Sequence, residues 1–353
     1  MTLRAPVPPR APPPRQHRVW SWRSPAARAL LWQALALAGL LAGLLWLVHN
    51  TQVNMAARGI QSGWDFLGQT AGFDIGEQLI AFDAGDSLAR AFLVGLLNTL
   101  RVALLGILLC TLLGTLIGLG RLSRNWLLRA LCRAYVELFR NVPLLVQLLV
   151  WYLLLVEYLP DSAAAWSWRD ALFLSKAGLA FPTLVAGTND TNGWSDWSGW
   201  HWQLPALQGF GIEGGGALSP EFIAVTVGLG GYTAAFVAEV VRAGIASVPH
   251  GQIEAAQSVG LSRRQTLRLV TGPLALRVIL PPLTNQYLNL TKNSSLAVAI
   301  GYPDLVSIAN TTLNQTGRAV ECIGVIMLVY LALSLLTAAL MAVFNRRVAL
   351  KER

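Results

Sequence analysis

Long apolar stretches recur along the chain, and their lengths match the thickness of a lipid bilayer. Residues 29–48 form an uncharged, apolar stretch of 20 residues, and a helix of about 20 such residues crosses ~30 Å of hydrocarbon. The other stretches of this kind are 88–120, 136–158, 221–241, 278–300 and 319–344. The pattern predicts an all-α, polytopic membrane protein with about six transmembrane helices.

The stretch 88–120 has 33 residues, which is more than one straight span needs. We expect its first part, which carries Arg90, to be an amphipathic helix along the membrane interface. Residues 88–347 as a whole are predicted to form a transmembrane domain. Residues 29–87 precede it as a first span with an outer loop, and 348–353 follow it as a cytoplasmic tail.

The segments between the spans differ in composition. Residues 1–28 contain seven prolines, six arginines and no acidic residue, which predicts a disordered, basic cytoplasmic tail. Residues 159–220, the Trp-rich insert, contain six tryptophans. Because Trp favours the membrane interface, we expect this insert on or near the outer leaflet. Within it, residues 171–188 are moderately apolar but contain Lys176 and Pro182, so we expect a re-entrant or interfacial piece there.

The basic residues are distributed unevenly between the two sides of the membrane. The segments that alternating spans place on one side carry 20 of the 27 Lys and Arg residues, and those on the other side carry four. Acidic residues show the reverse: three lie in the segments of the first side and 11 in those of the second. Since Lys and Arg accumulate in cytoplasmic loops, the chain is predicted to lie in a bacterial inner membrane with both termini cytoplasmic.

Composition excludes several other classes of protein. Charged residues make up 13% of the chain, against roughly 25% in soluble domains. The net charge of +9 comes from basic residues at the ends of apolar stretches, which indicates orientation and no nucleic acid partner. The three cysteines and four histidines lack ligand spacing, so we expect no metal. Neither a G-x-x-x-x-G-K-[ST] phosphate loop nor a G-x-S-x-G motif occurs, so we expect no ATPase, no other enzyme and no bound cofactor.

The predicted inner loop, residues 242–277, is unusually long. A helix is expected over residues 252–259, because good helix formers fill it and Gly260 can adopt the left-handed conformation that closes a helix. Ser262 can cap a second helix, and Pro273 is expected to stop its regular hydrogen bonding. Two short helices at an angle form a rigid knob that fits a groove on a soluble partner. The spacing alone fits an ordinary amphipathic connector equally well.

The first of these helices resembles the cytoplasmic signature of the permease subunits of ATP-binding cassette (ABC) importers. It reads Glu254, Ala255, Ala256 and, after three further residues, Gly260. In that family the pattern continues as Ile-any-Leu-Pro, and here it reads Val-Thr-Gly-Pro at 270–273, so that Gly stands at the Leu position. The resemblance implies that the loop, including Pro273, is the coupling helix on which the ATP-binding subunit acts.

Further stretches are similar to the polar amino acid branch of this family. They are NTLRVA at 98–103, ELFRNVP at 137–143, RVILPPLTNQYLNL at 277–290 and TKNSSLAVAIGYPDL at 291–305. The extra first span and the long insert resemble the general L-amino acid permeases, which have a broad substrate range. The resemblance implies a pair of ATP-binding subunits, a second permease subunit in a heterodimer and an extracytoplasmic amino-acid-binding protein. It also implies that the partner subunits use the ATP.

Polar side chains within the fifth predicted span are candidates for the translocation path. Lys292, Asn293, Ser294 and Ser295 are expensive to place in a membrane unless they face a cavity or a partner. A cation and hydroxyl groups at this position can meet the carboxylate of an amino acid. The alternative is that they only hold the spans together by hydrogen bonds.

Arg101 is a second candidate for the translocation path. We expect it to pair with Glu157 or Glu321, because a charge in a span needs a partner. The alternative is that its long side chain reaches the outer surface.

A third group of candidates lies at the expected inner side. Arg140, Asn141 and Pro143 are at the inner mouth of the third span, where they are candidates for an inner gate; a basic membrane anchor is the alternative. Glu239 and Arg242 are one turn apart at the inner end of the fourth span, and we expect a simple ion pair between them.

The combined prediction is a membrane-spanning permease subunit of an ATP-driven amino acid importer, which supplies the translocation path. A stand-alone secondary amino acid transporter is the first alternative. Many such transporters are built from inverted repeats, and the other half of this chain has no second copy of the Glu-Ala-Ala loop. A membrane scaffold is the second alternative, and the polar residues of the fifth span argue against it.

Overall fold

The computed structural model describes residues 25–59, 62–186, 200–209 and 211–348. The chain divides into two compact units, Met1–Gln61 and Ser62–Arg353. In the first unit, helix α1 (Pro25–Ala57) contains the predicted first span and extends beyond it at both ends. Residues 1–24 of the predicted first tail and 349–353 of the second lie outside the described residues. Residues 25–28, which were also expected in the disordered tail, begin helix α1.

The second unit consists mainly of helices. They follow one another as α2 (Leu88–Arg121), α3 (Trp126–Asn141), α4 (Leu144–Tyr158), α5 (Pro220–Ala246), α8 (Gly272–Asn293) with the 3₁₀ segment η4 (Ser294–Ile300), α9 (Leu305–Thr316) and α10 (Ala319–Val348). Among the described residues of the whole chain, five helices are long and apolar enough to cross a membrane, and the bent pair α3 and α4 makes a sixth if it is one span. The prediction of a mainly helical protein with about six spans is confirmed.

Helix α2 begins at Leu88 and continues without a break for 34 residues. The expected separate interfacial helix at its start is therefore wrong. The side chain of Ser87 caps the helix by accepting a hydrogen bond from the backbone N–H of Arg90, and the Arg90 guanidinium lies 3.3 Å from Asp86. This local pair satisfies the charge that had suggested an amphipathic segment.

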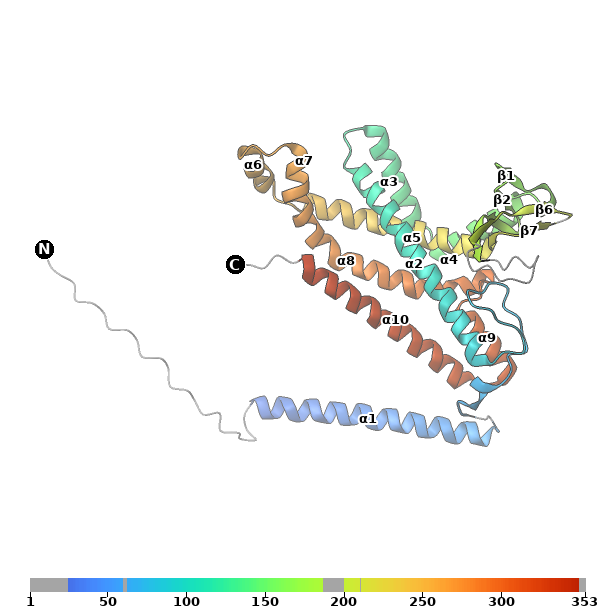
Figure 1. Cartoon of the computed structure of the whole chain (residues 1–353). Coiled ribbons are helices and arrows are strands. Elements are labelled where there is room, and N and C mark those ends of the chain that lie inside the picture. Colours follow the sequence, from blue (N-terminus) through green and yellow to red (C-terminus); the bar gives the residue numbers. More distant parts are fainter. Residues whose placement is uncertain (1–24, 60–61, 187–199, 210, 349–353) are drawn as a thin grey trace, which may run out of the picture. The chain divides into compact units, whose positions relative to one another are not determined.

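Helices α2 and α5 cross at very short distance, as Figure 1 shows. A Cβ atom on Gly114 would lie 2.6 Å from Cβ of Val237, and one on Gly118 would lie 2.8 Å from the carbonyl oxygen of Ala238. Small residues four positions apart allow two membrane helices to approach so closely. The crossing therefore depends on the absence of side chains at these two positions.

The predicted third span, 136–158, is bent and does not form one straight helix. Helices α3 and α4 meet at an angle of 107°. Val142 is extended, because the residue before a proline is disfavoured in the helical conformation, and Pro143 follows it. The amide nitrogen of Gln147 donates to the carbonyl oxygens of Phe139 at 2.9 Å and Val142 at 2.8 Å. These are carbonyls that the end of a helix leaves without partners, so Gln147 stabilises the bend.

The Trp-rich insert forms short antiparallel strands. After a 3₁₀ turn, η2 (Ser162–Ala164), one sheet has the order β1 (Trp166–Trp168), β2 (Leu172–Ser175), β3 (Gly178–Phe181) and β8 (Gly216–Leu218); the others pair β4 (Thr183–Ala186) with β5 (Trp200–Gln203) and β6 (Ala206–Gln208) with β7 (Gly211–Glu213). Residues 171–186 were expected to be a re-entrant or interfacial piece: the strands exclude the re-entrant alternative, and the interfacial one stays a prediction. Residues 187–188 lie outside the described residues. Apolar runs this short fit strands as well as helices. The expected place of the insert at the outer leaflet stays a prediction.

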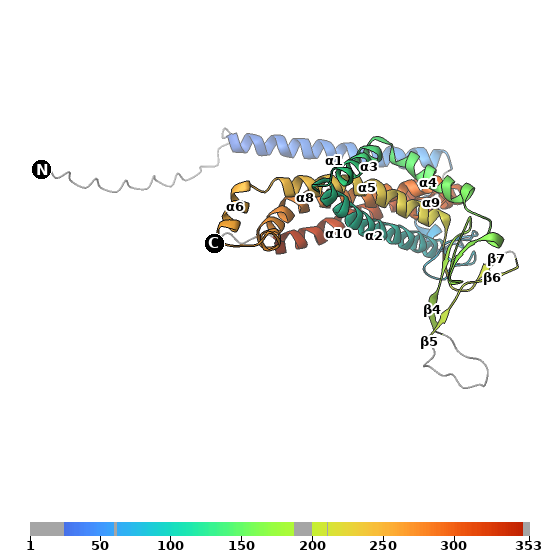
Figure 2. The same cartoon turned by 90° about the horizontal axis from the view of Figure 1, so that it is seen from above.

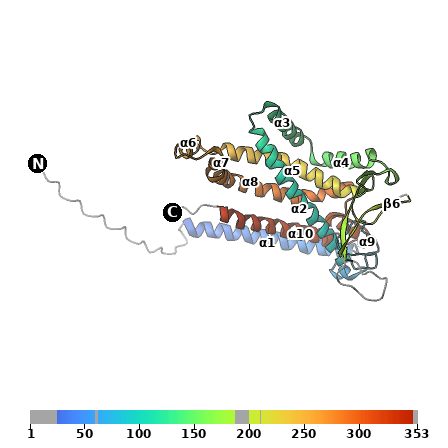
Figure 3. The same cartoon turned by 45° about the horizontal axis from the view of Figure 1, so that its top comes forward.

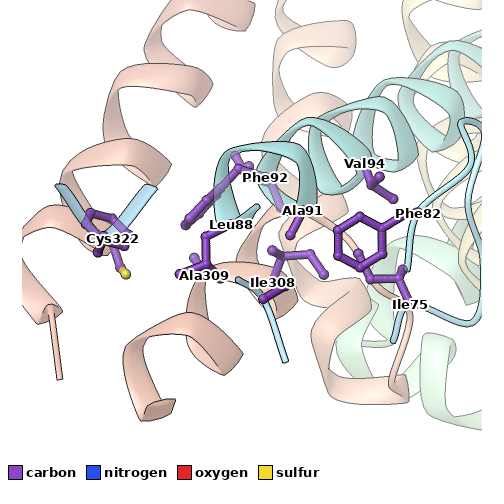
Figure 4. Packing of buried hydrophobic residues seen from close by; sticks show 12 residues of the cluster. Ile75, Phe82, Leu88, Ala91, Phe92, Val94, Ile308, Ala309 and Cys322 are labelled. Atoms are coloured by element: carbon purple, nitrogen blue, oxygen red, sulfur yellow. The ribbon is translucent and has the colours of Figure 1, made fainter. Parts of the chain in front are cut away.

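The segment before α2 packs on the ends of α2, α9 and α10. Its short helix η1 (Asp65–Gly68) buries Phe66, and Ile75 and Phe82 are also buried there. Figure 4 shows Ile75 and Phe82 against the part of α2 that carries Val94. This apolar cluster holds the whole segment 69–87 against the helices, so the segment is part of the folded unit.

Helices α5, α8 and α10 run side by side in the second unit, and α2 crosses α5 (Figure 3). The connection between α5 and α8 contains α6 (His250–Ser258) and α7 (Arg263–Thr266). Figures 1 and 2 show α6 at one end of α5 and the β-strands at the other. The two segments that the sequence assigns to opposite sides of a membrane are therefore at opposite ends of these helices.

Candidate functional site

The connection between α5 and α8 forms the knob that the sequence suggests. Helix α6 ends at Ser258, and Gly260 has φ of +85°, so it adopts the predicted left-handed conformation. The backbone N–H of Leu261 donates to the carbonyl oxygen of Ala256 at 3.2 Å and closes the turn. Glu254, Ala255 and Gly260 are exposed, and Ala256 is buried. One face of α6 is therefore free and the opposite face packs on the unit.

The second half of the knob is capped as predicted but ends differently. Ser262 and Gln265 form a reciprocal capping box at the start of α7. A π-helical segment, η3 (Leu267–Thr271), follows and leads directly into α8, where Pro273 lies in the first turn. Pro273 was expected to stop the regular hydrogen bonding of this helix, and the α pattern does give way to the π turn before it, although the helical path continues into α8. The wider π turn accommodates the missing N–H and the bulk of the ring, so the knob is joined rigidly to α8.

The predicted Ser-Ser break is present at the far end of α8. The helix ends at Asn293, and η4 starts at Ser294. The buried Ser294 hydroxyl donates to the carbonyl oxygen of Thr291 at 2.7 Å, and the Ser295 hydroxyl donates to that of Lys292 at 2.8 Å. Both hydroxyls therefore satisfy backbone carbonyls at the change of helix type. Lys292, the cation of this set, is exposed.

Arg101 has a different partner from those expected. Its guanidinium lies 2.6 Å from the carboxylate of Glu77 and 4.1 Å from the centre of the Phe222 ring. The expected pairing with Glu157 or Glu321 is wrong, because residues 69–87 fold back along α2 and bring Glu77 to it. Glu321 accepts a hydrogen bond from the backbone N–H of Gly63 at 2.8 Å instead.

Glu77 joins three parts of the second unit. The Glu77 carboxylate contacts Arg101 on α2. It also accepts a hydrogen bond from the hydroxyl of Ser219, which caps the start of α5. Burial raises the pKa of Glu77, while the hydrogen bond from Ser219 and the charge of Arg101 oppose that shift. An adjoining cavity of about 460 Å³ is lined by Phe73, Asp74, Ile75, Gly76, Glu77, Ser219, Glu221, Gly301, Pro303, Ser307, Ile308 and Thr311. This end of α5 thus presents a predominantly acidic hollow beside a partly buried ion pair.

Sequence reasoning missed a buried polar group next to this pair. The amide of Asn98 donates to the carbonyl oxygens of Glu77 at 2.8 Å and Pro303 at 2.9 Å. Asp304 caps α9 by accepting from the N–H of Ser307 at 2.8 Å, and burial raises the pKa of Asp304 to about 7. The signal for Asn98 was an amide within an apolar stretch, which needs a buried partner.

The other end of α5 carries a larger and more exposed group of charges. The expected ion pair between Glu239 and Arg242 is present, with the Arg242 Nε 3.2 Å from a carboxylate oxygen. Arg121, at the end of α2, also pairs with Glu239, which the sequence did not predict. Arg140 lies 5.1 Å from the centre of the Phe236 ring, and Asn141 and Pro143 are exposed at the bend. The candidate gate residues therefore lie beside the C-terminal half of α5, next to Phe236 and Glu239.

The chain is similar to a family of membrane transport proteins and to several of its members. The family described as binding-protein-dependent transport system inner membrane component matches residues 110–350. YhdX of Escherichia coli strain K12, a candidate amino-acid ABC transporter permease, is 45% identical over 94% of this chain and 97% of its own length. The general L-amino acid transport system permease protein AapQ of Rhizobium johnstonii is 41% identical, and the match covers 95% of this chain and 96% of that protein.

A solved structure supports the same comparison. The crystal structure of an amino acid ABC transporter with histidines contains a chain that is 26% identical to this one. The similarity has a TM-score of 0.51 and covers 73% of this chain and 94% of that chain.

Proposed function

The chain belongs to the binding-protein-dependent transport system inner membrane components and is a permease subunit of an ATP-driven amino acid importer, and from that premise we propose roles for its residues. Importers of this family place ATP hydrolysis on a separate subunit, so this chain is a transport subunit and no enzyme. The matches leave no support for the stand-alone secondary transporter. This chain binds no cofactor in our proposal, and its partner subunits use the ATP.

The coupling loop is the first proposed site. Helix α6 presents Glu254 and Ala255 on a free face, and Ala256 packs inward. The partner that fits this face is a groove on the ATP-binding subunit. Gly260 closes the helix, and the π turn before Pro273 joins the knob to α8. A push on α6 is therefore transmitted to the helix that ends at the Ser-Ser break.

The orientation of the chain follows from the charge distribution. The chain is an inner membrane component, and the end of α5 that carries α6 also carries the basic segments 121–140 and 242–277. We assign this end to the cytoplasm. Both termini are then cytoplasmic, and the β-strands of the Trp-rich insert and the hollow beside Glu77 face outward.

The partners follow from the same assignment. Importers of this family work with ATP-binding subunits, and usually with a second permease and a binding protein. For this chain we propose a pair of ATP-binding subunits, a heterodimer with a second permease, and an extracytoplasmic amino-acid-binding protein that docks at the outward end. The substrates we propose are L-amino acids of several kinds, as the name of AapQ states for that relative.

The translocation path is proposed to pass between the outer hollow and the inner half of α5. Arg101 stabilises the outer end through Glu77, and Lys292 with Asn293, Ser294 and Ser295 lies at the break in the fifth span. The exposed ammonium of Lys292 is the group of this set that a substrate carboxylate can approach. Arg140, Asn141 and Pro143 are proposed to form the inner gate.

Purification of the tagged chain in mild detergent tests the assembly. We expect an ATP-hydrolysing subunit and a second permease to accompany it, identified by mass spectrometry, with ATP hydrolysis that rises when the loaded binding protein is added. A chain that purifies alone, and moves amino acids in vesicles without ATP, would contradict the importer assembly.

A further inference from the structure

A cavity of about 440 Å³ lies between the end of α2, helix α3 and the inner half of α5. It is lined by Arg121, Val136, Glu137, Arg140, Asn141, Phe236 and Glu239. Two guanidinium groups and two carboxylates therefore face one hollow, and their formal charges cancel. Val136 and Phe236 add apolar surface beside them. Such a mixture differs from the acidic hollow at the other end of α5.

The charges of this cavity are not equivalent. Glu239 already pairs with Arg121 and Arg242, so this carboxylate is engaged. Within the described part of the chain, Glu137 and Arg140 form an ion pair neither with each other nor with another residue. They are one turn apart on α3, where opposite charges often meet. Arg140 lies over the Phe236 ring instead, and both side chains are exposed to solvent.

An unpaired cation and an unpaired anion in one hollow match a ligand that carries both charges. A guanidinium binds a carboxylate through two parallel hydrogen bonds, and a carboxylate accepts hydrogen bonds from an ammonium group. We propose that this cavity is a release site for the zwitterionic part of an amino acid. Arg140 binds the α-carboxylate, Glu137 binds the α-ammonium, and Phe236 contacts the side chain. The proposal rests on the amino acid importer function.

Other ligands fit these residues less well. A nucleotide or an anionic lipid headgroup carries net negative charge and needs a lining with more positive than negative groups. This lining has two of each, so it has no positive excess. An acyl chain would bury the exposed charges of Glu137 and Arg140 without partners, which is unfavourable. Exposed ion pairs bind weakly, and weak binding suits a site from which the substrate leaves.

Equilibrium binding of radiolabelled L-alanine tests the site directly. The protein is the importer purified in detergent with its partner subunits and without the binding protein. We expect the Glu137→Gln and Arg140→Gln variants each to bind roughly 2- to 5-fold more weakly than wild type, since an exposed ion pair contributes about this factor. Arg133→Gln is the matched control, because Arg133 is an exposed arginine of the same helix outside the cavity lining.

Two analogues of alanine separate binding from a purely structural effect. Alaninamide lacks the carboxylate and N-acetylalanine lacks the ammonium, so both should compete poorly in wild type. In Arg140→Gln the disadvantage of alaninamide relative to alanine should shrink at least several-fold while that of N-acetylalanine stays, and Glu137→Gln should show the converse. A structural role would not produce this matched pattern. Unchanged L-alanine affinity in both variants, or unchanged analogue preferences, would overturn the site.

ATP-driven uptake by the reconstituted wild-type importer is measured in parallel. Absence of uptake would contradict the importer function itself, whereas the binding series decides the cavity independently of turnover. Uptake with no binding difference among wild type, Glu137→Gln and Arg140→Gln would leave the function standing and reject the release site.

Discussion

The two ends of helix α5 both carry ion pairs, but the pairs are built differently. At the outward end, Glu77 is 12% and Arg101 20% exposed at their side chains, and each pairs with a residue distant in the sequence. At the inward end, Glu239 and Arg242 are 30% and 33% exposed and lie one turn apart. The first pair ties a loop to a helix, while the second is local and leaves more of its charge accessible to solvent. Arg121 on α2 also binds Glu239, so one long-range contact is present at this end as well. The end of α5 near Glu77 therefore holds the more buried ion pair, and the end near Glu239 holds the more exposed one.

Removing Glu77 should have the largest effect on this contrast. Glu77→Ala leaves the Arg101 guanidinium without its carboxylate in a mostly buried position, which costs about 3–5 kcal/mol. We expect a clear fall in the free energy of unfolding, measured by denaturation of the purified importer in detergent. Asp74→Ala, an exposed carboxylate in the same segment, is the control and should change little. Equal losses for the two variants would show that the ion pair does not stabilise the outer end.

The crossing of α2 and α5 joins the two ends, and Gly118 tests it. A Cβ atom at Gly118 would lie 2.8 Å from the backbone oxygen of Ala238, so Gly118→Ala should destabilise the unit by about 1–3 kcal/mol. In Gly324→Ala, on α10, the new Cβ has its nearest neighbour at 3.8 Å, so this variant should be neutral or slightly stabilising. Thermal unfolding of both variants measures the difference. A Gly118→Ala protein as stable as Gly324→Ala would refute the close crossing.

Asp304 should make the stability of the folded chain vary with pH. Its pKa is about 7 in the folded chain and about 3.9 in an unfolded one. Between these values the folded state holds the proton and the unfolded state does not, so stability falls as pH rises through this range. Asp304→Asn keeps a cap for α9 without the titration. The melting temperature of the variant relative to wild type should therefore rise from pH 5 to pH 7, and a constant difference would contradict this.

The smallest effect is expected at the inward end. Arg242→Gln removes one exposed partner of Glu239 but leaves Arg121, so unfolding should change by about 0–1 kcal/mol. Thermal unfolding of both variants gives the loss of stability for Arg242→Gln and for Glu77→Ala, and the ratio of the two losses measures the contrast between the two ends. A loss as large as that of Glu77→Ala would mean that the inner end is as tightly built as the outer one.

Local signals made the structure of the α6–α7 connection predictable. Gly260 closes α6 and Ser262 caps α7 through contacts with residues no more than one helical turn away. The end of α6 and the start of α7 therefore follow from residue type alone. The same holds for Glu239 with Arg242, which are neighbours on one helix. The number of spans was also accessible, because length and hydropathy decide it.

Long-range contacts account for what the sequence did not reveal. Arg101 pairs with Glu77 only because an apolar cluster folds residues 69–87 back along α2. The bend between α3 and α4 depends on a side chain, Gln147, that reaches two backbone carbonyls. In the insert, runs such as Leu172–Ser175 are too short for hydropathy to separate strand from helix, and pairing partners decide.

The coupling role of the loop is the central claim, and a pair of glycines tests it most directly. Gly251 and Gly260 both have open space for a side chain, but only Gly260 has a positive φ, +85°. ATP-driven amino acid uptake is measured in proteoliposomes for Gly260→Ala and Gly251→Ala, with membrane insertion verified for both. We expect uptake to be largely lost in Gly260→Ala, because a Cβ atom at positive φ distorts the end of α6, and retained in Gly251→Ala, where the same methyl group adds no backbone strain. Normal uptake in Gly260→Ala would contradict the account.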